Sequence, residues 1–145
     1  MGSARDVFKQ GQQAFNAHDL DGIINQYSED AELTGPGGME VKGRDAIREY
    51  TRGWLQGFPD AKLREINVIE AGDIIVEEGI FTGTQTGVFP TPMGDIPPTG
   101  KPVEGKFVDI FVIKDGKVVS DHLTFDRLEL MEQLGLVPAA AGAAR

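Results

Sequence analysis

The chain has 145 residues, of which 40% are hydrophobic and 26% are charged, and its formal net charge is −9 at pH 7. This length and composition predict one globular domain with a sizeable core, and the negative charge argues against nucleic acid as a partner because phosphate groups would be repelled. The absence of cysteine excludes disulfides, thiolate nucleophiles and cysteine-bound zinc. The two histidines lie far apart without a metal-binding motif, so we expect neither a metal nor another cofactor.

The hydrophobic runs of the chain are only a few residues long, far short of the roughly 20 residues that span a bilayer. The N-terminal segment also lacks the apolar stretch of a secretory signal peptide. We therefore expect a cytoplasmic protein that does not bind membranes. A single domain is expected over residues 1–138, and the alanine-rich residues 139–145 are expected to form a disordered tail.

Hydrophobic residues recur at helical spacing in three segments near the N-terminus. Residues 3–17 are predicted to form an amphipathic helix. A second helix is predicted to begin near Asp19, a residue type that caps helices, and its apolar positions run as far as Tyr27. A third is predicted to begin near Gly43 and to end before Pro59. Its apolar stripe consists of Ile47, Tyr50, Trp54 and Phe58.

The hydrophobic period changes to two from residue 62 onward, which is typical of strands. Strands are predicted over residues 31–34, 62–69, 73–85, 103–114 and 117–125. The dipeptide Asp115-Gly116 predicts a type I′ turn that pairs the last two strands antiparallel. The proline-rich residues 88–102 are not suited to a sheet interior, and we expect a long loop there that lies across the mouth of a cavity.

Helices that come first and a mostly antiparallel sheet that follows are typical of an α+β domain. We expect a strongly curved sheet wrapped by the three N-terminal helices into a cone. A pocket is expected between the two layers, where small-molecule sites commonly lie.

Four segments of the chain resemble the SnoaL-like polyketide cyclases, which form the ester cyclase branch of the nuclear transport factor two-like superfamily. They are "FNAHDLDGIINQYSEDAEL", "VKGRDAIREYTRGWLQGFPD", "GTQTG" followed by "PPTGKPV", and "VDIFVIKDGKVVSDHLTFDRLELMEQLG". The likeness covers about residues 5 to 136 and rests on the order and spacing of these segments together.

The resemblance implies a conical, cystatin-like α+β barrel that forms a homodimer or homotetramer through the outer face of its sheet. The cyclases of this family close polyketide rings by intramolecular aldol condensation without a cofactor. The resemblance therefore implies an enzyme that acts on a hydrophobic small molecule. The carboxylate that serves as the general acid/base of the family lies at the end of the last strand, and Asp126 occupies that position.

Asp126 also has a structural interpretation, because Asp126 and Glu129 form a capping-box pattern at the start of an amphipathic helix. A carboxylate that faces an apolar pocket loses water and becomes a stronger base toward an acidified C–H bond. His122 precedes Asp126 by four residues, which places both on one face of a strand. His122 is therefore a second catalytic candidate, and its alternative is a histidine satisfied by hydrogen bonds on a partly polar face.

The predicted pocket wall comes from the aromatic stripes of the helices. Tyr27, Tyr50, Trp54 and Phe58 are the expected substrate-binding residues, although such stripes more often belong to a core. Gln85 stands where the family often has histidine and is expected to orient a substrate carbonyl; its alternative is an exposed residue of the strand.

The sequence departs from the family at three further positions that bear on the site. Val112 stands in the strand before the hairpin, where the family often has arginine or histidine, and we include it in the predicted substrate site. Asp121-His122 replaces a family His-Trp pair. These changes keep open a second interpretation, in which the domain binds a ligand or mediates dimerisation without catalysis.

Water addition to an epoxide is a further alternative, since related enzymes use an Asp-Arg-Asp arrangement, but no arginine is evident in a central strand. Glu77 and Glu78 are adjacent in a strand, so one should face the pocket, and the sequence does not show which. Asp109 is assigned to the outer face of the sheet.

Overall fold

A computed structural model of the protein describes residues 3–138. The predicted disordered tail at residues 139–145 lies outside the described residues. The N-terminal half contains α1 (Ala4–Asn16), α2 (Leu20–Ile24), β1 (Tyr27–Gly35), the short 3-10 helix η1 (Pro36–Gly38), β2 (Met39–Lys42) and α3 (Arg44–Gly57). The rest contains β3 (Lys62–Ala71), β4 (Ile74–Thr84), β5 (Phe89–Thr91), β6 (Gly94–Ile96), β7 (Pro102–Lys114), β8 (Lys117–Phe125) and α4 (Arg127–Gln133).

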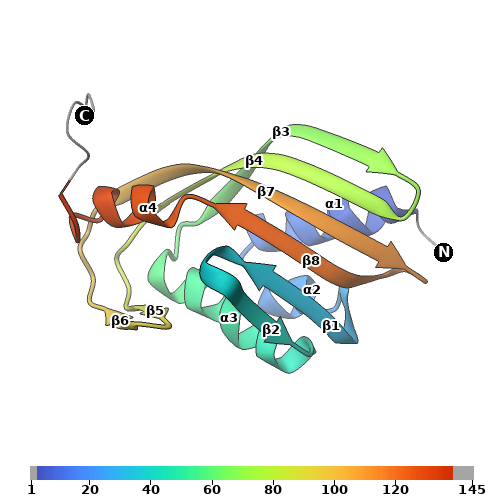
Figure 1. The fold of residues 1–145 in the computed structure, drawn as a ribbon, viewed down its shortest axis with the longest axis horizontal. Coiled ribbons are helices and arrows are strands. Elements are labelled where there is room, and N and C mark those ends of the chain that lie inside the picture. The colour runs from blue at the N-terminus through green and yellow to red at the C-terminus, as the bar shows by residue number, and fades with distance from the viewer. Residues whose placement is uncertain (1–2, 139–145) are drawn as a thin grey trace.

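Six of the strands form one curved sheet in the order β2-β1-β8-β7-β4-β3. Neighbouring strands are antiparallel except β1 and β8, which run parallel. The helices α1, α2 and α3 cover one face of this sheet, and α4 follows the end of β8 (Figure 1). The predicted α+β class with a curved sheet wrapped by three N-terminal helices is therefore confirmed.

The turn between β7 and β8 forms as predicted. Asp115 and Gly116 both have positive φ angles, 52° and 75°, which a type I′ turn requires at its two central positions. The strand β8 contains one irregularity, because Val112 pairs with Ser120 whereas Ile113 pairs with Val118. This bulge leaves Val119 as the extra residue on β8.

Two predicted boundaries are wrong. The helical spacing that extends to Tyr27 is interrupted, because α2 ends at Ile24 and Tyr27 begins β1. Residues 88–102, predicted as a loop without strands, contain the hairpin of β5 and β6, which stands apart from the main sheet. Phe89 on this hairpin is buried against Trp54 and Phe58 at the C-terminal end of α3, so the segment packs on the helix layer.

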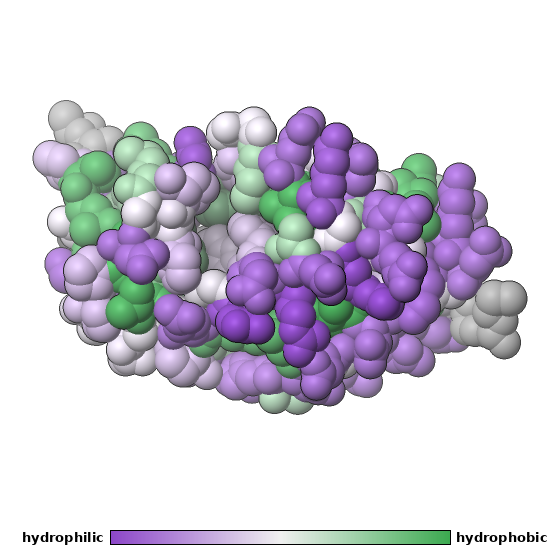
Figure 2. Space-filling view, turned by 90° about the horizontal axis from the view of Figure 1, so that it is seen from below, coloured by the Kyte–Doolittle hydropathy of each residue, from purple (hydrophilic) through white to green (hydrophobic). Residues whose placement is uncertain are grey.

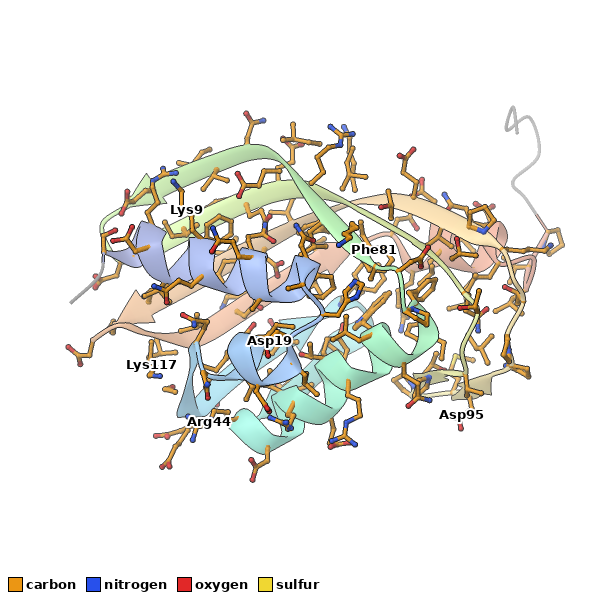
Figure 3. The ribbon with its side chains drawn as sticks, turned by 180° about the vertical axis from the view of Figure 1, so that it is seen from behind. Lys9, Asp19, Arg44, Phe81, Asp95 and Lys117 are labelled. Carbon is orange, nitrogen blue, oxygen red and sulfur yellow. The ribbon has the colours of Figure 1, made fainter. Side chains whose placement is uncertain are left out.

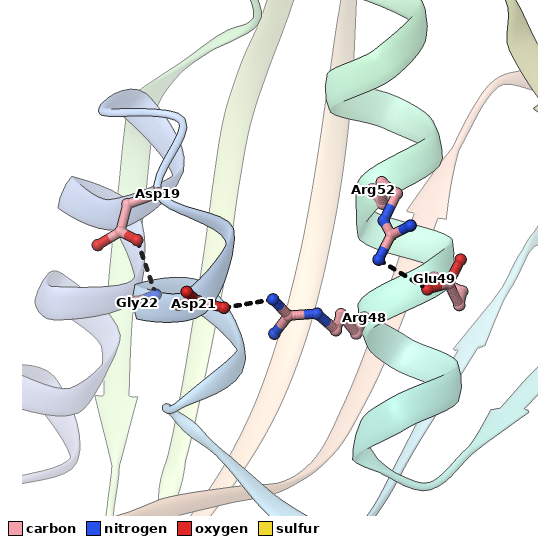
Figure 4. Close-up of polar contacts among 6 residues, drawn as sticks. All are labelled: Asp19, Asp21, Gly22, Arg48, Glu49 and Arg52. Atoms are coloured by element: carbon pink, nitrogen blue, oxygen red, sulfur yellow. Dashed lines mark hydrogen bonds and ion pairs between the residues drawn. The ribbon is translucent and has the colours of Figure 1, made fainter.

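Side-chain caps stabilise the N-termini of α1, α2 and α4. One ion pair joins α2 to α3, which has no side-chain cap (Figure 4). Asp19 accepts a hydrogen bond from the backbone N–H of Gly22 at 3.0 Å, and Asp21 pairs with Arg48. Exposed ion pairs of this kind contribute at most about 1 kcal/mol. Burial of Ile23 and Ile24 beneath the sheet contributes more to the position of α2.

The core between helices and sheet has two parts. One part joins α1 and α2 to the sheet, and the other joins the end of α3 to β5 and α4. Phe81 on β4 points into the space between the sheet and α3 (Figure 3), where its ring lies 5.2 Å from that of Trp54. The side of the molecule seen in Figure 2 is mostly hydrophilic, so its hydrophobic side chains are largely directed inward.

None of the helices within residues 3–138 is both long enough and hydrophobic enough to cross a membrane.

Candidate active site

A cavity of about 180 Å³ lies between the helix layer and the inner face of the sheet. Most of its wall is aromatic or aliphatic, with side chains from α1, α3, β4, β7 and β8. The aromatic lining residues are Phe8, Phe15, Tyr27, Tyr50, Trp54, Phe81, Phe107, Phe111 and Phe125. An engineered cavity of about 150 Å³ holds benzene, so this one encloses roughly one ring of a ligand.

Three carboxyl groups lie on the cavity wall, one on each of three neighbouring strands. Glu77 on β4 is opposite Asp109 on β7, and Asp109 is opposite Leu123, two residues beyond Asp121 on β8. Side chains two residues apart in a strand share a face, so all three carboxyls project to the inner face. Only 1% of Glu77, 9% of Asp109 and 4% of Asp121 is exposed. We call Glu77, Asp109 and Asp121 the carboxyl cluster.

Few hydrogen-bond donors reach the carboxyl cluster. The hydroxyl of Tyr27 donates to Oδ2 of Asp121 at 2.9 Å, and the side-chain amide of Gln12 donates to Oε2 of Glu77. Three buried acceptors have no partner: Oε1 of Gln12, Oδ1 of Asp109 and Oδ1 of Asp121. Buried polar atoms are nearly always satisfied in proteins, so unpaired atoms on a cavity wall indicate where a ligand or water binds.

The proton affinities of the cluster are strongly altered. Burial, with smaller effects from Glu65 and Asp121, raises the pKa of Glu77 from 4.5 to about 8. Burial and the neighbouring Asp121 carboxyl raise the pKa of Asp109 well above its ordinary value. Burial also raises the pKa of Asp121, but hydrogen bonds with Asp109 and Tyr27 oppose that rise. The two aspartates therefore titrate as a pair that shares a proton, and the hydrogen bond from Tyr27 favours the ionised form at Asp121.

Positive charge is scarce at this site. Among the described residues that line the cavity, Lys106 is the one lysine or arginine, and it is exposed. Glu104, Asp126 and Glu129 also line the cavity, and they add to its negative charge. The described part of the chain contains no group of three or more His, Cys, Asp or Glu side chains arranged to hold a metal ion.

The two predicted catalytic residues lie outside the dry part of the cavity. Asp126 lines the cavity but is exposed, and it caps α4 by accepting a hydrogen bond from the N–H of Glu129 at 3.0 Å. The expectation that it faces a dry pocket is therefore not met. His122 is exposed on the outer face of β8 and bonds through Nδ1 to Oγ1 of Thr34 at 2.7 Å. It shares that face with Ser120 and Thr124, which follow the bulge in β8, and the cavity is on the opposite face.

The predicted substrate-binding residues divide into two groups. Tyr27, Tyr50 and Trp54 line the cavity, and their part in binding stays a prediction. Phe58 is fully buried behind Trp54, with ring centroids 5.9 Å apart. Val112 has the opposite strand parity to the inward-facing Phe111 and lies half-buried on the outer side of β7.

Gln85 is a structural residue of the 86–101 segment rather than part of the cavity wall. Its side chain is fully buried, and Nε2 donates to the carbonyls of Gly87, Ile96 and Pro97 at 3.0–3.1 Å. Its Oε1 accepts from the backbone N–H of Thr99 at 3.2 Å and from the hydroxyl of Thr99 at 2.8 Å. One side chain thus satisfies several backbone groups that the pairing of β5 with β6 leaves free, and it joins the two ends of the segment.

The assignment of Asp109 to the outer face is wrong, because Asp109 shares its strand parity with the inward-facing Phe107 and Phe111. The open question about Glu77 and Glu78 is settled for Glu77, which lies inside with Ile75. Asp121 was noted only as a departure from the family, and Gln12 was not considered. A charged residue flanked two positions away by aromatic residues is the signal that identifies Asp109 from sequence.

Comparison with known proteins places the chain in a family. The sequence profile of the SnoaL-like domain matches residues 8–121. No curated protein matched the chain in sequence.

Several solved structures share the fold. AclR, a proposed hydroxylase from Streptomyces galilaeus, is 27% identical with a TM-score of 0.80, covering 96% of this chain and 85% of its own. A proposed SnoaL-like polyketide cyclase from Jannaschia sp. CCS1 is 22% identical with a TM-score of 0.81, covering 93% of each chain. IdmH, a proposed polyketide cyclase from Streptomyces antibioticus, is 24% identical with a TM-score of 0.76, covering 92% of this chain and 99% of its own. The profile match spans most of the sequence, and the chain therefore belongs to the SnoaL-like domain family.

Proposed function

We propose that this protein is a cofactor-independent acid–base enzyme of the cyclase or isomerase type, which removes a proton from carbon next to a carbonyl group of an apolar small molecule. The observation that carries the proposal is the carboxyl cluster on the wall of an otherwise apolar cavity. A buried carboxyl pair that shares a proton holds an acid and a base together at neutral pH. Family membership and the polyketide cyclases among the structural neighbours support the same reaction class.

Asp121 is the general base in this proposal, in place of the exposed Asp126. Its Oδ1 is unpaired on the cavity wall, while Tyr27 holds Oδ2 and fixes the carboxylate plane. The carboxylate takes the proton from carbon, and the electron pair of the broken C–H bond moves into the carbonyl to form an enolate. Burial makes Asp121 a stronger base than an exposed carboxylate, which favours this step.

Asp109 is the resident acid. Its proton stabilises the enolate oxygen at the point where negative charge develops. In ring closure the enolate carbon attacks a second carbonyl of the same molecule, and the resulting alkoxide takes a proton from the cluster. In isomerisation Asp121 returns its proton to a different carbon. Both outcomes leave the cluster in its starting protonation state, and neither consumes an oxidant or reductant.

The epoxide-hydrolase alternative gains no support from the cavity. The Asp-Arg-Asp arrangement of those enzymes needs an arginine between the two aspartates. Among the described residues of the cavity wall, the one basic side chain is that of the exposed Lys106.

We also propose that the protein is a homodimer or larger oligomer through the outer face of the sheet. Ile69, Val76 and Ile110 lie in register across β3, β4 and β7 on that face. Ile69 is 59% exposed and Ile110 is 38% exposed. An apolar row that crosses three strands in solvent is typical of a surface that a partner covers.

The acid–base proposal is tested by deuterium exchange into phenylacetone, a one-ring ketone, in deuterated buffer at neutral pH, followed by NMR. The wild-type protein is expected to accelerate exchange at the carbons next to the carbonyl over the rate in buffer. Asp121→Asn should abolish the acceleration. Asp126→Asn is the matched control, because asparagine still caps α4 and the base is untouched.

Two results would contradict the proposal: wild-type exchange no faster than in buffer, or equal exchange by wild type and Asp121→Asn. Loss of exchange in Asp126→Asn alone would return the role of base to Asp126. Circular dichroism and a thermal melt of each variant confirm that the fold is kept.

A further inference from the structure

We infer that the cavity takes a positively charged substrate, a protonated amine carried on an apolar body with about one ring inside the cavity. This inference deepens the proposed function, because it names the charge of the molecule that the same site binds. The inference depends on the proposed function in one respect only, which is that the substrate enters this cavity.

The first argument is the nature of the unpaired atoms. Oε1 of Gln12, Oδ1 of Asp109 and Oδ1 of Asp121 are all hydrogen-bond acceptors, and all three residues line the cavity. A primary ammonium group has three N–H donors and no acceptor. A ligand that brings several donors satisfies these atoms, whereas a bare carbonyl oxygen can accept only the proton that the Asp109–Asp121 pair holds and leaves the other acceptors unpaired. Oδ1 of Asp121 has a second lone pair, which stays available to the carbon acid.

The second argument is charge. The three buried carboxyls have no basic side chain beside them among the described lining residues, since Lys106 is exposed. An ionised carboxylate buried without a counter-charge is costly, and a cation from outside removes that cost. The exposed Glu104 and Asp126 at the same cavity extend the negative charge to solvent and favour the approach of a cation.

The third argument is the aromatic wall. Tyr50 and Trp54 line the cavity with their rings 6.5 Å apart, and Trp54 also contacts the rings of Phe81 and Phe125. Aromatic faces attract ammonium groups and accept the apolar part of the same molecule. Carboxylates and aromatic rings together therefore suit a cation with a hydrocarbon body better than a neutral or an anionic ligand.

Binding of the cation should displace a proton from the cluster. Asp109 or Glu77 would ionise when the ammonium group arrives, and the proton leaves to the buffer. The ionisable groups around them are Glu65 on β3, Asp121 and His122 on β8, Tyr27 on β1 and Tyr50 on α3. None of these is a lysine or arginine that would supply the positive charge instead.

The test compares benzylamine, which is protonated at pH 7, with benzyl alcohol, a neutral molecule of matched size, by isothermal titration calorimetry of the full chain. We expect the wild-type protein to bind benzylamine at least about tenfold more tightly. We also expect proton release with the amine only, measured as a dependence of the heat on the ionisation enthalpy of the buffer. Asp109→Asn should reduce the preference, and Glu78→Gln, on the outer side of the same strand as Glu77, should keep it.

Equal binding of the two compounds, tighter binding of the alcohol, or no binding of either to the wild-type protein would each overturn the inference. The decisive comparison uses the wild-type protein, so it does not depend on a variant that fails to fold. Its outcome is also separate from that of the exchange experiment. Exchange of the neutral ketone without a preference for the amine would support the acid–base proposal and overturn the inference about charge. A preference for the amine without exchange would indicate a domain that binds the cation without catalysis.

Discussion

Glu77→Gln should make the protein more stable at alkaline pH, because it replaces a buried acidic side chain with a neutral one. Glu77 is 1% exposed and faces Asp109 across the strand pair. Glutamine has nearly the same shape, it can still accept from Gln12, and its amide can donate to Asp109. The substitution therefore removes the ionisation of position 77 and changes little else.

The magnitude follows from the pKa of Glu77, which is raised from 4.5 to about 8 in the folded protein. Each pKa unit corresponds to about 1.4 kcal/mol, so the full effect is about 5 kcal/mol as an upper value. The folded state holds a proton that the unfolded chain loses above pH 4.5. The contribution of Glu77 to stability is thus fully present below about pH 4.5 and is lost as the pH rises to about 8.

The raised pKa values of Asp109 and Asp121 act in the same direction, so the wild-type protein should lose stability between about pH 5 and pH 9 by several kcal/mol. A loss of this size is comparable with the whole stability of a small domain. Glu77→Gln should match the wild type near pH 4.5 and exceed it by a few kcal/mol at pH 8.5.

The measurement is urea denaturation at a series of pH values from 4.5 to 9, with the free energy of unfolding extrapolated to water. Glu78→Gln is the matched control. Glu78 lies next to Glu77 but on the outer side of β4, where it accepts a hydrogen bond from Nδ2 of Asn67 at 2.7 Å. The control should follow the pH dependence of the wild type. Equal wild-type stability at pH 5 and pH 9, or a Glu77→Gln variant that is less stable than wild type at pH 8.5, would refute the reasoning.

Two further predictions concern the 86–101 segment and the outer face of the sheet. Gln85→Ala should lower the free energy of unfolding by about 2–4 kcal/mol and speed hydrogen exchange in residues 86–101, because it leaves buried loop groups unpaired. Gln56→Ala, which removes a single exposed bond to Val88, is the control, and an equal loss in both variants would argue against this role. Ile110→Lys should convert an oligomer to a monomer in sedimentation equilibrium, whereas Leu128→Lys on α4 should not. A wild-type monomer would rule out the proposed interface.

Much of the fold was accessible from local pattern. Helical spacing identified α1 and α3, alternation identified β3, β4, β7 and β8, and Asp115-Gly116 identified the hairpin turn. These features depend on contacts between residues near in sequence, which is why the sequence shows them. The same local argument failed at Tyr27, where a helical period continues past the end of α2 and long-range pairing with β8 decides the conformation.

The candidate site depended on which face of each strand is inside. Alternation correctly placed Glu77 and Glu78 on opposite faces. The predicted shared face of His122 and Asp126 is wrong, because Asp126 lies beyond the end of β8, where it caps α4 and lines the cavity, whereas His122 lies on the outer face. Alternation alone does not tell the inner face from the outer one, and an apolar outer face with Ile110 and Val112 made Asp109 look external. Gln85 was equally ambiguous, because its partners lie up to 14 residues away along the chain.

What the sequence determined by itself is therefore most of the longer helices and strands and the α+β class, which follow from periodicity along the chain, and the family, which follows from the resemblance of four segments. Only the tertiary structure decided which polar side chains are deprived of water. Burial of Glu77, Asp109 and Asp121 results from the pairing of β4, β7 and β8 beneath α1 and α3, and the proton affinities of the site arise from that burial.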